Sequence, residues 1–349
     1  MMENKMFCYQ CQETVGNQGC SQVGVCGKTP ETAGLQDLLI DVTKGLAEVI
    51  NEVRCKGKEI NNVYDDQVSE NLFITITNAN FDDQMIIERL KEKNIKLVEI
   101  QRSRGYSHRK SLSIAKIERI IKKIREVNDE VIIMVDNCYG ELVETKEPGH
   151  VGADIVVGSL MKNLGGGIAP TGGYVAGNQN LVYMVAERLT APGIGKDLGA
   201  NFNLNNAFFK GIFMAPNAVK NALKTAIFTA YMLEKLEYSN VSPRYDEPRT
   251  DIIQTLELKS KENLVSFTQG IQQTSPIDSF VHVLPAPMPG YPFDEVMAAG
   301  SFTQGSTIEL SADAPVIEPY TLYMQGGLTF EYGKLSILLA LSNMKRKLD

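Results

Sequence analysis

Several features of other protein classes are absent from this sequence of 349 residues. Its longest uncharged apolar stretches, such as residues 131–135, are far shorter than the roughly 20 residues needed to span a bilayer. The first seven residues have no apolar core of the kind found in signal peptides. Basic side chains are fewer than acidic ones, 35 against 42, so the net charge of -7 offers no surface suited to nucleic acid or anionic membrane. We therefore expect a cytoplasmic protein that acts on small molecules.

Cysteine and histidine are scarce as well. Six cysteines in a chain of this length are too few for a disulfide scaffold, and four of them fall within the first 26 positions. The three histidines show no spacing typical of metal ligands or a catalytic triad, so we assign them no role. A hydrophobic share of 43% is that of an ordinary globular protein and argues against disorder. The length allows two or three domains.

The clustered cysteines have a spacing that suits a metal. Cys8, Cys11, Cys20 and Cys26 follow the pattern C-x2-C-x8-C-x5-C, with glycines between them that allow a tight loop. Four thiolates on a short loop are typical of iron–sulfur clusters and of tetrahedral zinc. The spacing favours a metal site over unligated thiols. It does not separate iron from zinc, because structural zinc sites usually pair two C-x2-4-C units and this array has one.

A helix is predicted directly after the cysteines. Thr29 and Pro30 are typical of a helix N-cap followed by a first-turn proline, and apolar residues then recur at helical spacing as far as Val53. The alternating isoleucines and threonines of residues 72–78 indicate a strand. A short apolar run of this kind also fits a buried helix, so both interpretations stay open.

From residue 95 onward, strands and helices alternate. Residues 95–100 predict a strand, residues 112–127 a helix and residues 131–135 a second strand, which together form a right-handed, parallel βαβ unit. A further apolar strand at residues 155–157 leads into glycine-rich turns. This alternation predicts an α/β layer fold.

The last third of the sequence has a different pattern. Residues 218–236 predict a long helix with few helix-breaking residues. The remainder mixes short strands, short helices and proline-rich loops, such as residues 285–290. We interpret this part as a smaller α+β domain.

Asp136 and Lys162 lie at or just past the carboxyl ends of two predicted strands, where α/β folds place ligands. An enzyme that uses pyridoxal 5'-phosphate (PLP) needs a lysine amine to bind the cofactor covalently and a carboxylate to keep the pyridine nitrogen protonated. Ser159 is placed to donate a hydroxyl to the cofactor phosphate. On spacing alone, however, a lysine before a glycine turn is more often a solvated surface residue.

The cysteine segment resembles a known family. The motifs MFCYQCQET (residues 6–14), GVCGKTPE (24–31) and TITNANFDD (75–83) are similar to the start of the hybrid-cluster protein, or hydroxylamine reductase, family. The resemblance implies that the four cysteines hold a [4Fe-4S] cluster. In that family the catalytic hybrid cluster takes its ligands from later domains, which have no counterpart here. We therefore expect electron transfer from this segment and no hydroxylamine reduction.

The larger remainder resembles a second family. The motifs IQRSRGY (residues 100–106), VDNCYGE (135–141), GSLMKN (158–163) and QGGLT (325–329) are similar to the methionine gamma-lyase-related family, also known as aluminium resistance proteins. The resemblance implies a fold-type-I PLP architecture, with Lys162 as the Schiff-base residue and Asp136 as the partner of the pyridine nitrogen. It also implies cleavage of a carbon–sulfur bond, in which Lys162 moves protons between substrate carbons.

Other residues near these motifs allow two interpretations. Arg102, Arg104 and Tyr106 follow a predicted strand and can either contact the phosphate or the substrate carboxylate, or lie in a solvated loop. Cys138 beside the aspartate suggests redox chemistry, although a small buried thiol at a strand end is the commoner case.

Two departures from the lyase pattern bear on its activity. The family carries a further part of the large domain before the strand at residues 95–100, including a glycine-containing phosphate loop and a ring-stacking aromatic residue, for which we find no counterpart. Ile317 stands where the family pattern has an arginine suited to the substrate carboxylate. Losing strands from a central sheet also exposes apolar edges. We therefore expect weakened folding and weakened cofactor binding.

The sequence as a whole predicts an α/β protein of three parts. Residues 1–97 form a mainly helical iron–sulfur segment, residues 98–213 a partial fold-type-I PLP-dependent transferase-like large domain, and residues 214–349 a linking helix with a small α+β domain. The favoured function is a PLP-dependent carbon–sulfur lyase that acts, as a homo-oligomer, on a small sulfur-containing amino acid. The alternatives are an iron–sulfur redox protein with a redox partner, and a gene chimera whose parts have no joint function.

Overall fold

A computed structural model shows how these segments fold. The structure describes the following residues: 6–8, 20–24, 28–59, 61, 63–75, 95–106, 109–189, 194–195, 203–238, 240–288 and 293–345. The chain forms two compact units. The first comprises Met1–Lys96 and Ile124–Val131, and the second comprises Leu97–Lys123 and Ile132–Asp349.

The described part of the first unit is helical. Helix α1 covers Pro30–Cys55 and begins as predicted, because the Thr29 hydroxyl accepts a hydrogen bond from the Thr32 backbone N–H at 3.1 Å. Helix α2 covers Val63–Thr75. The ambiguous stretch at 72–78 is therefore helical as far as Thr75, and its last three residues lie outside the described part of the chain. Leu39 is fully buried and forms the centre of a small apolar cluster in this unit.

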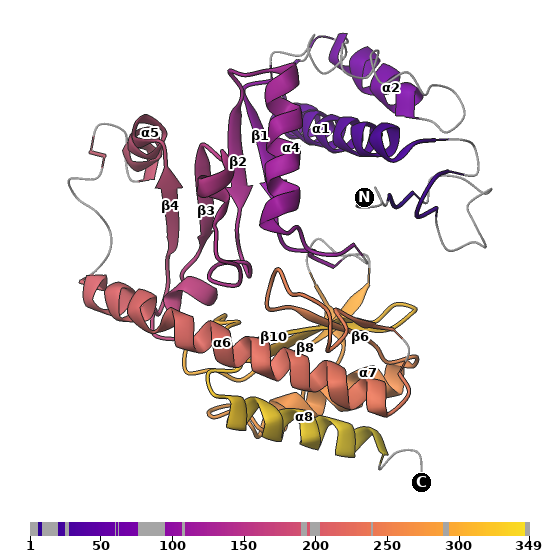
Figure 1. Cartoon of the computed structure of the whole chain (residues 1–349), viewed down its shortest axis with the longest axis vertical. Coiled ribbons are helices and arrows are strands. Elements are labelled where there is room, and N and C mark those ends of the chain that lie inside the picture. The colour runs from indigo at the N-terminus through magenta and orange to yellow at the C-terminus, as the bar shows by residue number, and fades with distance from the viewer. Residues whose placement is uncertain are drawn as a thin grey trace. The chain divides into compact units, whose positions relative to one another are not determined.

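The second unit begins with a sheet of four strands. Its strands and connecting helices are β1 (Leu97–Gln101), α4 (Ile114–Val127), β2 (Ile132–Asp136), β3 (Ile155–Ser159), β4 (Gly173–Gly177) and α5 (Gln179–Leu189). Strands β1, β2 and β3 run parallel and lie side by side in the order β1-β2-β3-β4, whereas β4 is antiparallel to β3 (Figure 1). The predicted βαβ unit is thus confirmed. Its parallel register places Gln101 opposite Asp136 and Asp136 opposite Val157, so the carboxyl ends of three strands meet at one edge.

Helix α6 (Asn205–Lys235) leads from this sheet to a second one. The helix starts well before the predicted residue 218, and Pro216 lies inside it. A proline in a helix interior removes one backbone hydrogen bond, and here the flanking turns continue on both sides. Among the described residues, no helix combines the length and the apolar character needed to cross a membrane.

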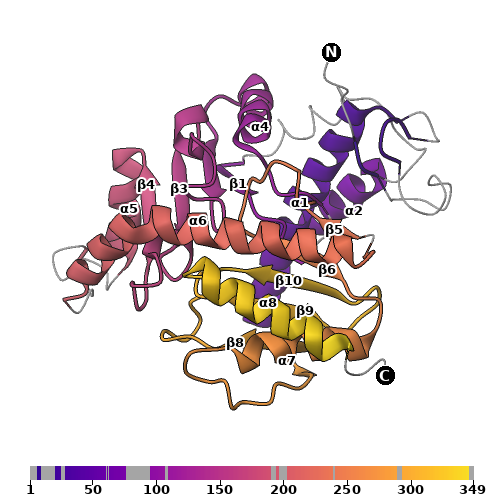
Figure 2. The ribbon, with the colours of Figure 1, turned by 60° about the horizontal axis from the view of Figure 1, so that its bottom comes forward.

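The second sheet has six strands, and all its pairings are antiparallel. Its elements are β5 (Val241–Ser242), β6 (Gln254–Glu257), α7 (Lys261–Gln273), β7 (Ala286–Pro287), β8 (Asp294–Ala299), β9 (Ser311–Pro315), β10 (Thr321–Gln325) and α8 (Phe330–Lys345). The strand order is β5-β6-β10-β9-β8-β7. Helices α6, α7 and α8 contribute side chains to one apolar core with this sheet, and Figure 2 shows α6 and α8 along it. The predicted small α+β domain is present.

The two faces of this second sheet differ in chemistry because successive side chains of a strand point to opposite sides. Leu256, Leu322 and Met324 point into the core with the three helices. The opposite side carries mainly polar residues that stand in register across neighbouring strands. We call this side the polar face and define it by Thr255, Glu295, Asp313, Tyr323 and Gln325. The face is the side of the sheet that the first sheet's loops contact.

Candidate active site

The site forms where the ends of β2 and β3 meet. Asp136 is the last residue of β2, and the next backbone N–H, that of Asn137, donates to the Val157 carbonyl of β3 at 2.9 Å. Ser159 ends β3, and Lys162 follows it by three residues. Because parallel strands finish at the same edge of the sheet, the structure brings Asp136, Ser159 and Lys162 into one region.

Asp136 is oriented by its own chain. Its Oδ1 accepts the backbone N–H of Cys138 at 3.0 Å, and the Cys138 thiol is a further neighbour of the carboxylate. Burial raises the pKa of Cys138 to about 12, an effect that the positive charge of Lys162 opposes and the Asp136 carboxylate reinforces. The thiol therefore stays protonated near neutral pH. Cys138 is a small buried thiol, only 9% exposed, and the redox interpretation loses its support because a thiolate is needed for such reactivity.

Lys162 is held above an aromatic ring. Its Nζ lies 4.3 Å from the centroid of the Tyr139 ring, a cation–π contact. Burial alone would lower the pKa of Lys162, but its electrostatic interactions with neighbouring groups, Asp136 among them, raise it. Burial raises the pKa of Tyr139, so the Tyr139 hydroxyl stays protonated near neutral pH. Lys162 is thus half-buried and interacts with Tyr139 and Asp136, so it is not the solvated surface residue that its spacing alone suggested.

The backbone around the lysine is fixed at several points. Ser159 Oγ accepts the N–H of Met161 at 3.1 Å, which leaves the hydroxyl proton available for another acceptor. A side chain at Gly165 would place its Cβ 1.5 Å from the Leu160 carbonyl oxygen, so the turn after the lysine requires glycine there. Tyr139 itself has a positive φ of 70°, a costly conformation for an aromatic residue that the surrounding contacts must maintain.

A network of buried polar side chains, centred on Arg102 and Glu141, lies next to these strand ends. Arg102 is fully buried and donates to Asn137 Oδ1 and Glu144 Oε2, each at 2.7 Å. Tyr174 Oη donates to Glu141 Oε1 at 3.0 Å, and burial raises the pKa of Glu141 to about 8. The solvated interpretation of Arg102 is therefore wrong, since its guanidinium is fully buried and bonded to Asn137 and Glu144. Its role is to anchor the loop that follows Asp136.

Arg104 and Tyr106 reach the polar face of the second sheet instead. Arg104 is 2% exposed and donates through Nη1 to Thr255 Oγ1 at 3.1 Å. Tyr106 packs its ring at 5.0 Å from that of Tyr323 and donates its hydroxyl to Glu295 at 3.4 Å. The solvated interpretation of Arg104 is wrong as well.

The sequence analysis missed the residues that the second sheet contributes. Burial raises the pKa of Asp313 of β9, and the positive charge of Lys162 opposes this shift, so the two groups are electrostatically coupled. Gln325 donates to Asp313 Oδ2 at 3.2 Å. Alternation of polar and apolar residues in β9 was the only signal in the sequence, and it does not say what the polar side faces. Ile317, where we expected the family to carry an arginine, is 51% exposed.

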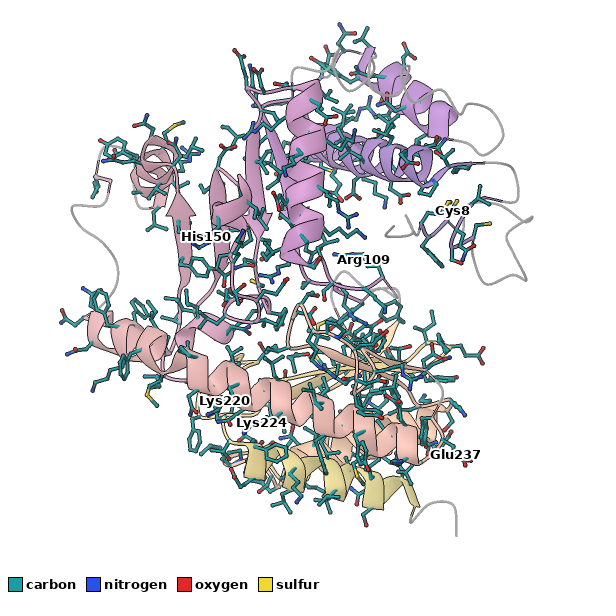
Figure 3. All side chains as sticks on the ribbon, in the orientation of Figure 1. Cys8, Arg109, His150, Lys220, Lys224 and Glu237 are labelled. Carbon is teal, nitrogen blue, oxygen red and sulfur yellow. The ribbon has the colours of Figure 1, made fainter. Side chains whose placement is uncertain are left out.

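The cysteines of the first unit are described in part. Cys8 and Cys20 form an antiparallel bridge with backbone hydrogen bonds of 2.9 and 2.8 Å (Figure 3 labels Cys8). The fully buried Lys28 donates to Cys8 Sγ at 3.6 Å. Cys11 and Cys26 lie outside the described residues. No group of three or more His, Cys, Asp or Glu side chains within the described ranges is arranged to hold a metal ion.

Comparison with known proteins identifies the larger part of the chain. The family model described as methionine gamma-lyase matches residues 36–345, a match that begins well before the predicted residue 98. The uncharacterized protein YnbB of Bacillus subtilis is 43% identical over 291 residues, which are 83% of this chain and 69% of that protein.

Solved structures of related proteins are similar to this chain in both sequence and fold. A protein involved in aluminum resistance from Clostridium acetobutylicum is 50% identical, with a TM-score of 0.71 over 76% of this chain and 62% of its own. A carbon-sulfur lyase involved in aluminum resistance from Clostridium novyi NT is 47% identical, with a TM-score of 0.70 over 75% of this chain and 60% of its own. The protein thus spans less than two thirds of the length of these two chains.

The first unit has a separate relationship. Hydroxylamine reductase of Desulfovibrio desulfuricans is 62% identical over 90 residues, which are 26% of this chain and 16% of that enzyme. The similarity to hydroxylamine reductases is therefore high but partial. With the family model matching most of the chain and the solved structures sharing its α/β fold, the protein belongs to the methionine gamma-lyase family.

Proposed function

We propose that this protein is a PLP-dependent carbon–sulfur lyase that acts on a sulfur-containing amino acid. The observation that carries the proposal is the approach of Asp136 and Lys162 at adjoining strand ends, with the lysine amine held over Tyr139. Membership of the methionine gamma-lyase family and the likeness to a carbon-sulfur lyase of Clostridium novyi NT support it. The chain covers only part of that relative, so activity is the point to be tested.

The residues present fit the cofactor in their chemistry. Lys162 would supply the primary amine, Asp136 the carboxylate for the pyridinium nitrogen, and Ser159 a hydroxyl proton for the phosphate. Bound PLP supplies an electron sink for the negative charge that develops at the α-carbon of an amino acid. The N–H of Cys138 holds the Asp136 carboxylate in place, and the protonated Cys138 thiol beside it adds no competing negative charge.

Lys162 is also the group that moves protons. With PLP bound, the amine of Lys162 would hold the cofactor and would also be the base that takes up and returns substrate protons. Asp136 and the Tyr139 ring both favour its protonated form, so the lysine can hold the proton it removes. Tyr139 packs against the apolar cluster around Val219 and Ile252, and this packing limits the access of water to one side of the amine.

Cofactor attachment is the direct test. Purified full-length protein incubated with PLP should absorb in the visible range, and borohydride should fix the cofactor to the peptide that contains Lys162. Asp136→Asn should retain the attachment but weaken it, because the pyridine nitrogen loses its anionic partner. A protein that stays colourless with excess PLP would refute the proposal.

The first unit supports a second candidate function, electron transfer by an iron–sulfur cluster. The 62% identity to a hydroxylamine reductase and the pairing of Cys8 with Cys20 favour it. We infer a division into an iron–sulfur segment (1–97), a partial large domain (98–213) and a linking helix with the small domain (214–349). Anaerobic reconstitution should give iron and sulfide in equal amounts. Stoichiometric zinc without sulfide would contradict this assignment.

A further inference from the structure

The polar face carries two carboxylates that stand close to each other. Met297 of β8 pairs with Asp313 of β9, and Glu295 lies two residues before Met297 on the same face. Diagonal neighbours of this kind have Cβ atoms about 7–8 Å apart, within reach of one small group placed between the carboxylates. We call Glu295 and Asp313 the acidic pair.

One carboxylate of the acidic pair has an unused acceptor. Glu295 is 3% exposed, and its Oε1 has no hydrogen-bond partner among the described residues. Its Oε2 accepts only the long 3.4 Å bond from Tyr106. A buried carboxylate oxygen without a donor is costly, so a donor from a bound molecule would be favourable at this position.

The surroundings of the acidic pair suit a cation. Tyr106 and Tyr323 lie with ring centroids 5.0 Å apart and planes tilted by 36°, next to Glu295 and across the strand from Asp313. Aromatic rings and carboxylates both attract ammonium groups. Burial raises the pKa of Glu295, and the nearby charge of Asp313 raises it further, as expected for a carboxylate that lies beside a like charge.

The cations nearby are engaged elsewhere. Arg104 bonds to Thr255 and is attracted by the buried Asp251, on the β6 side of the polar face. Lys162 acts on Asp313. Among the described residues, no cation acts on Glu295, so this carboxylate is the member of the acidic pair that lacks a compensating charge.

We propose that the acidic pair binds an ammonium group on the leaving thiol of the substrate. The preferred substrates are then thioether amino acids with a positively charged side arm, whereas methionine, whose leaving methanethiol is neutral, is a poor substrate. This inference rests on the proposed lyase function for its chemistry, but not for its binding test. In this inference the second sheet selects the substrate, whereas the motif residues of the first sheet bind the cofactor.

Two isosteric probes test the proposal. S-(2-aminoethyl)-cysteine and S-propyl-cysteine have the same number of heavy atoms and differ in the terminal ammonium. Their dissociation constants are measured by calorimetry on the full chain, with and without PLP. We expect the aminoethyl probe to bind about tenfold more tightly, the equivalent of one charge-assisted hydrogen bond.

Charge-neutral variants then locate the effect. Glu295→Gln and Asp313→Asn should each reduce the preference, and the double variant should abolish it while binding S-propyl-cysteine as tightly as the parent. Unchanged propyl binding shows that the variants are folded. Glu331→Gln, at an exposed position of α8 on the other side of the sheet, is the matched control and should keep the preference.

The outcomes separate this inference from the lyase proposal. If PLP does not attach, the lyase function fails, and the probe ratio on the PLP-free chain, compared between the parent and Glu295→Gln, still decides whether Glu295 binds the ammonium group. If PLP attaches but the two probes bind equally, the lyase function stands and the acidic pair has no part in specificity. A preference that survives in the double variant also overturns the inference.

Discussion

The two sheets of the second unit build the candidate site by different means. The first sheet places Asp136, Ser159 and Lys162 at strand ends through short, recognisable motifs and a parallel register. The second sheet contributes Asp313 and Glu295 from strand interiors, where only the pairing of β8, β9 and β10 brings them together. Site residues that lie close together in the sequence can therefore be predicted from motifs. Site residues that only strand pairing brings together cannot.

Removal of the Lys162 amine should have the largest effect, because it abolishes the attachment of the cofactor to the first sheet. Lys162→Ala leaves no amine above Tyr139, so borohydride should attach no cofactor at all. Lys220→Ala, on the exposed side of α6 (Figure 3), is the control and should label like the parent. Mass spectrometry of digested, reduced protein measures both. Equal labelling of Lys162→Ala and the parent would show that another lysine binds the cofactor.

Loss of the buried guanidinium should give the largest change in stability. Arg102→Met leaves the buried Asn137 and the half-buried Glu144 without their donor, and the loss of hydrogen bonds to a charged group should cost about 2–3 kcal/mol. Arg119→Met on the exposed face of α4 should cost little. The free energy of unfolding in urea compares the two. A similar small loss for both variants would mean that the network behind the strand ends contributes nothing.

Glu141 should make the stability depend on pH. Its folded-state pKa of about 8 is raised by burial from 4.5, so between these pH values the folded state holds a proton that the unfolded chain has released. Stability should therefore fall as pH rises from about 4.5 to about 8, by an amount on the order of a few kcal/mol, and then level off.

Glu141→Gln keeps an acceptor for the Tyr174 hydroxyl but cannot titrate. Melting temperatures measured across this range should lose most of their pH dependence in the variant, and Glu118→Gln on the surface of α4 should not change it. An unchanged profile in Glu141→Gln would place the titrating group elsewhere.

The second sheet offers a smaller, matched test. Thr255→Val removes an acceptor of the buried Arg104 and should cost about 1–2 kcal/mol in the free energy of unfolding. Thr321 lies on the same face of the neighbouring strand, and its hydroxyl has no hydrogen-bond partner among the described residues. Thr321→Val should therefore be neutral or stabilising. Equal effects would mean that Arg104 is not held by the polar face.

The sequence predicted local structure well where one physical rule dominates. The cap at Thr29, the βαβ unit and the α/β class follow from capping chemistry and hydrophobic periodicity. It failed for the start of α6, because the packing of the turns around Pro216 outweighs the local cost of a proline. It failed for Arg102 because a charged side chain is buried only when its partners, here Asn137 and Glu144, arrive from another loop.

The sequence by itself therefore determined the family of the larger part, the order of its first strands and helices, and the residues that carry motifs. Lys162 and Asp136 could be proposed because strand ends are local features that a parallel sheet always gathers at one edge. Only the tertiary structure decided that Tyr139 lies under the lysine, that Arg102 is an internal anchor, and that Asp313 faces the site. These placements depend on register and burial between segments far apart in the chain, which periodicity and spacing do not specify.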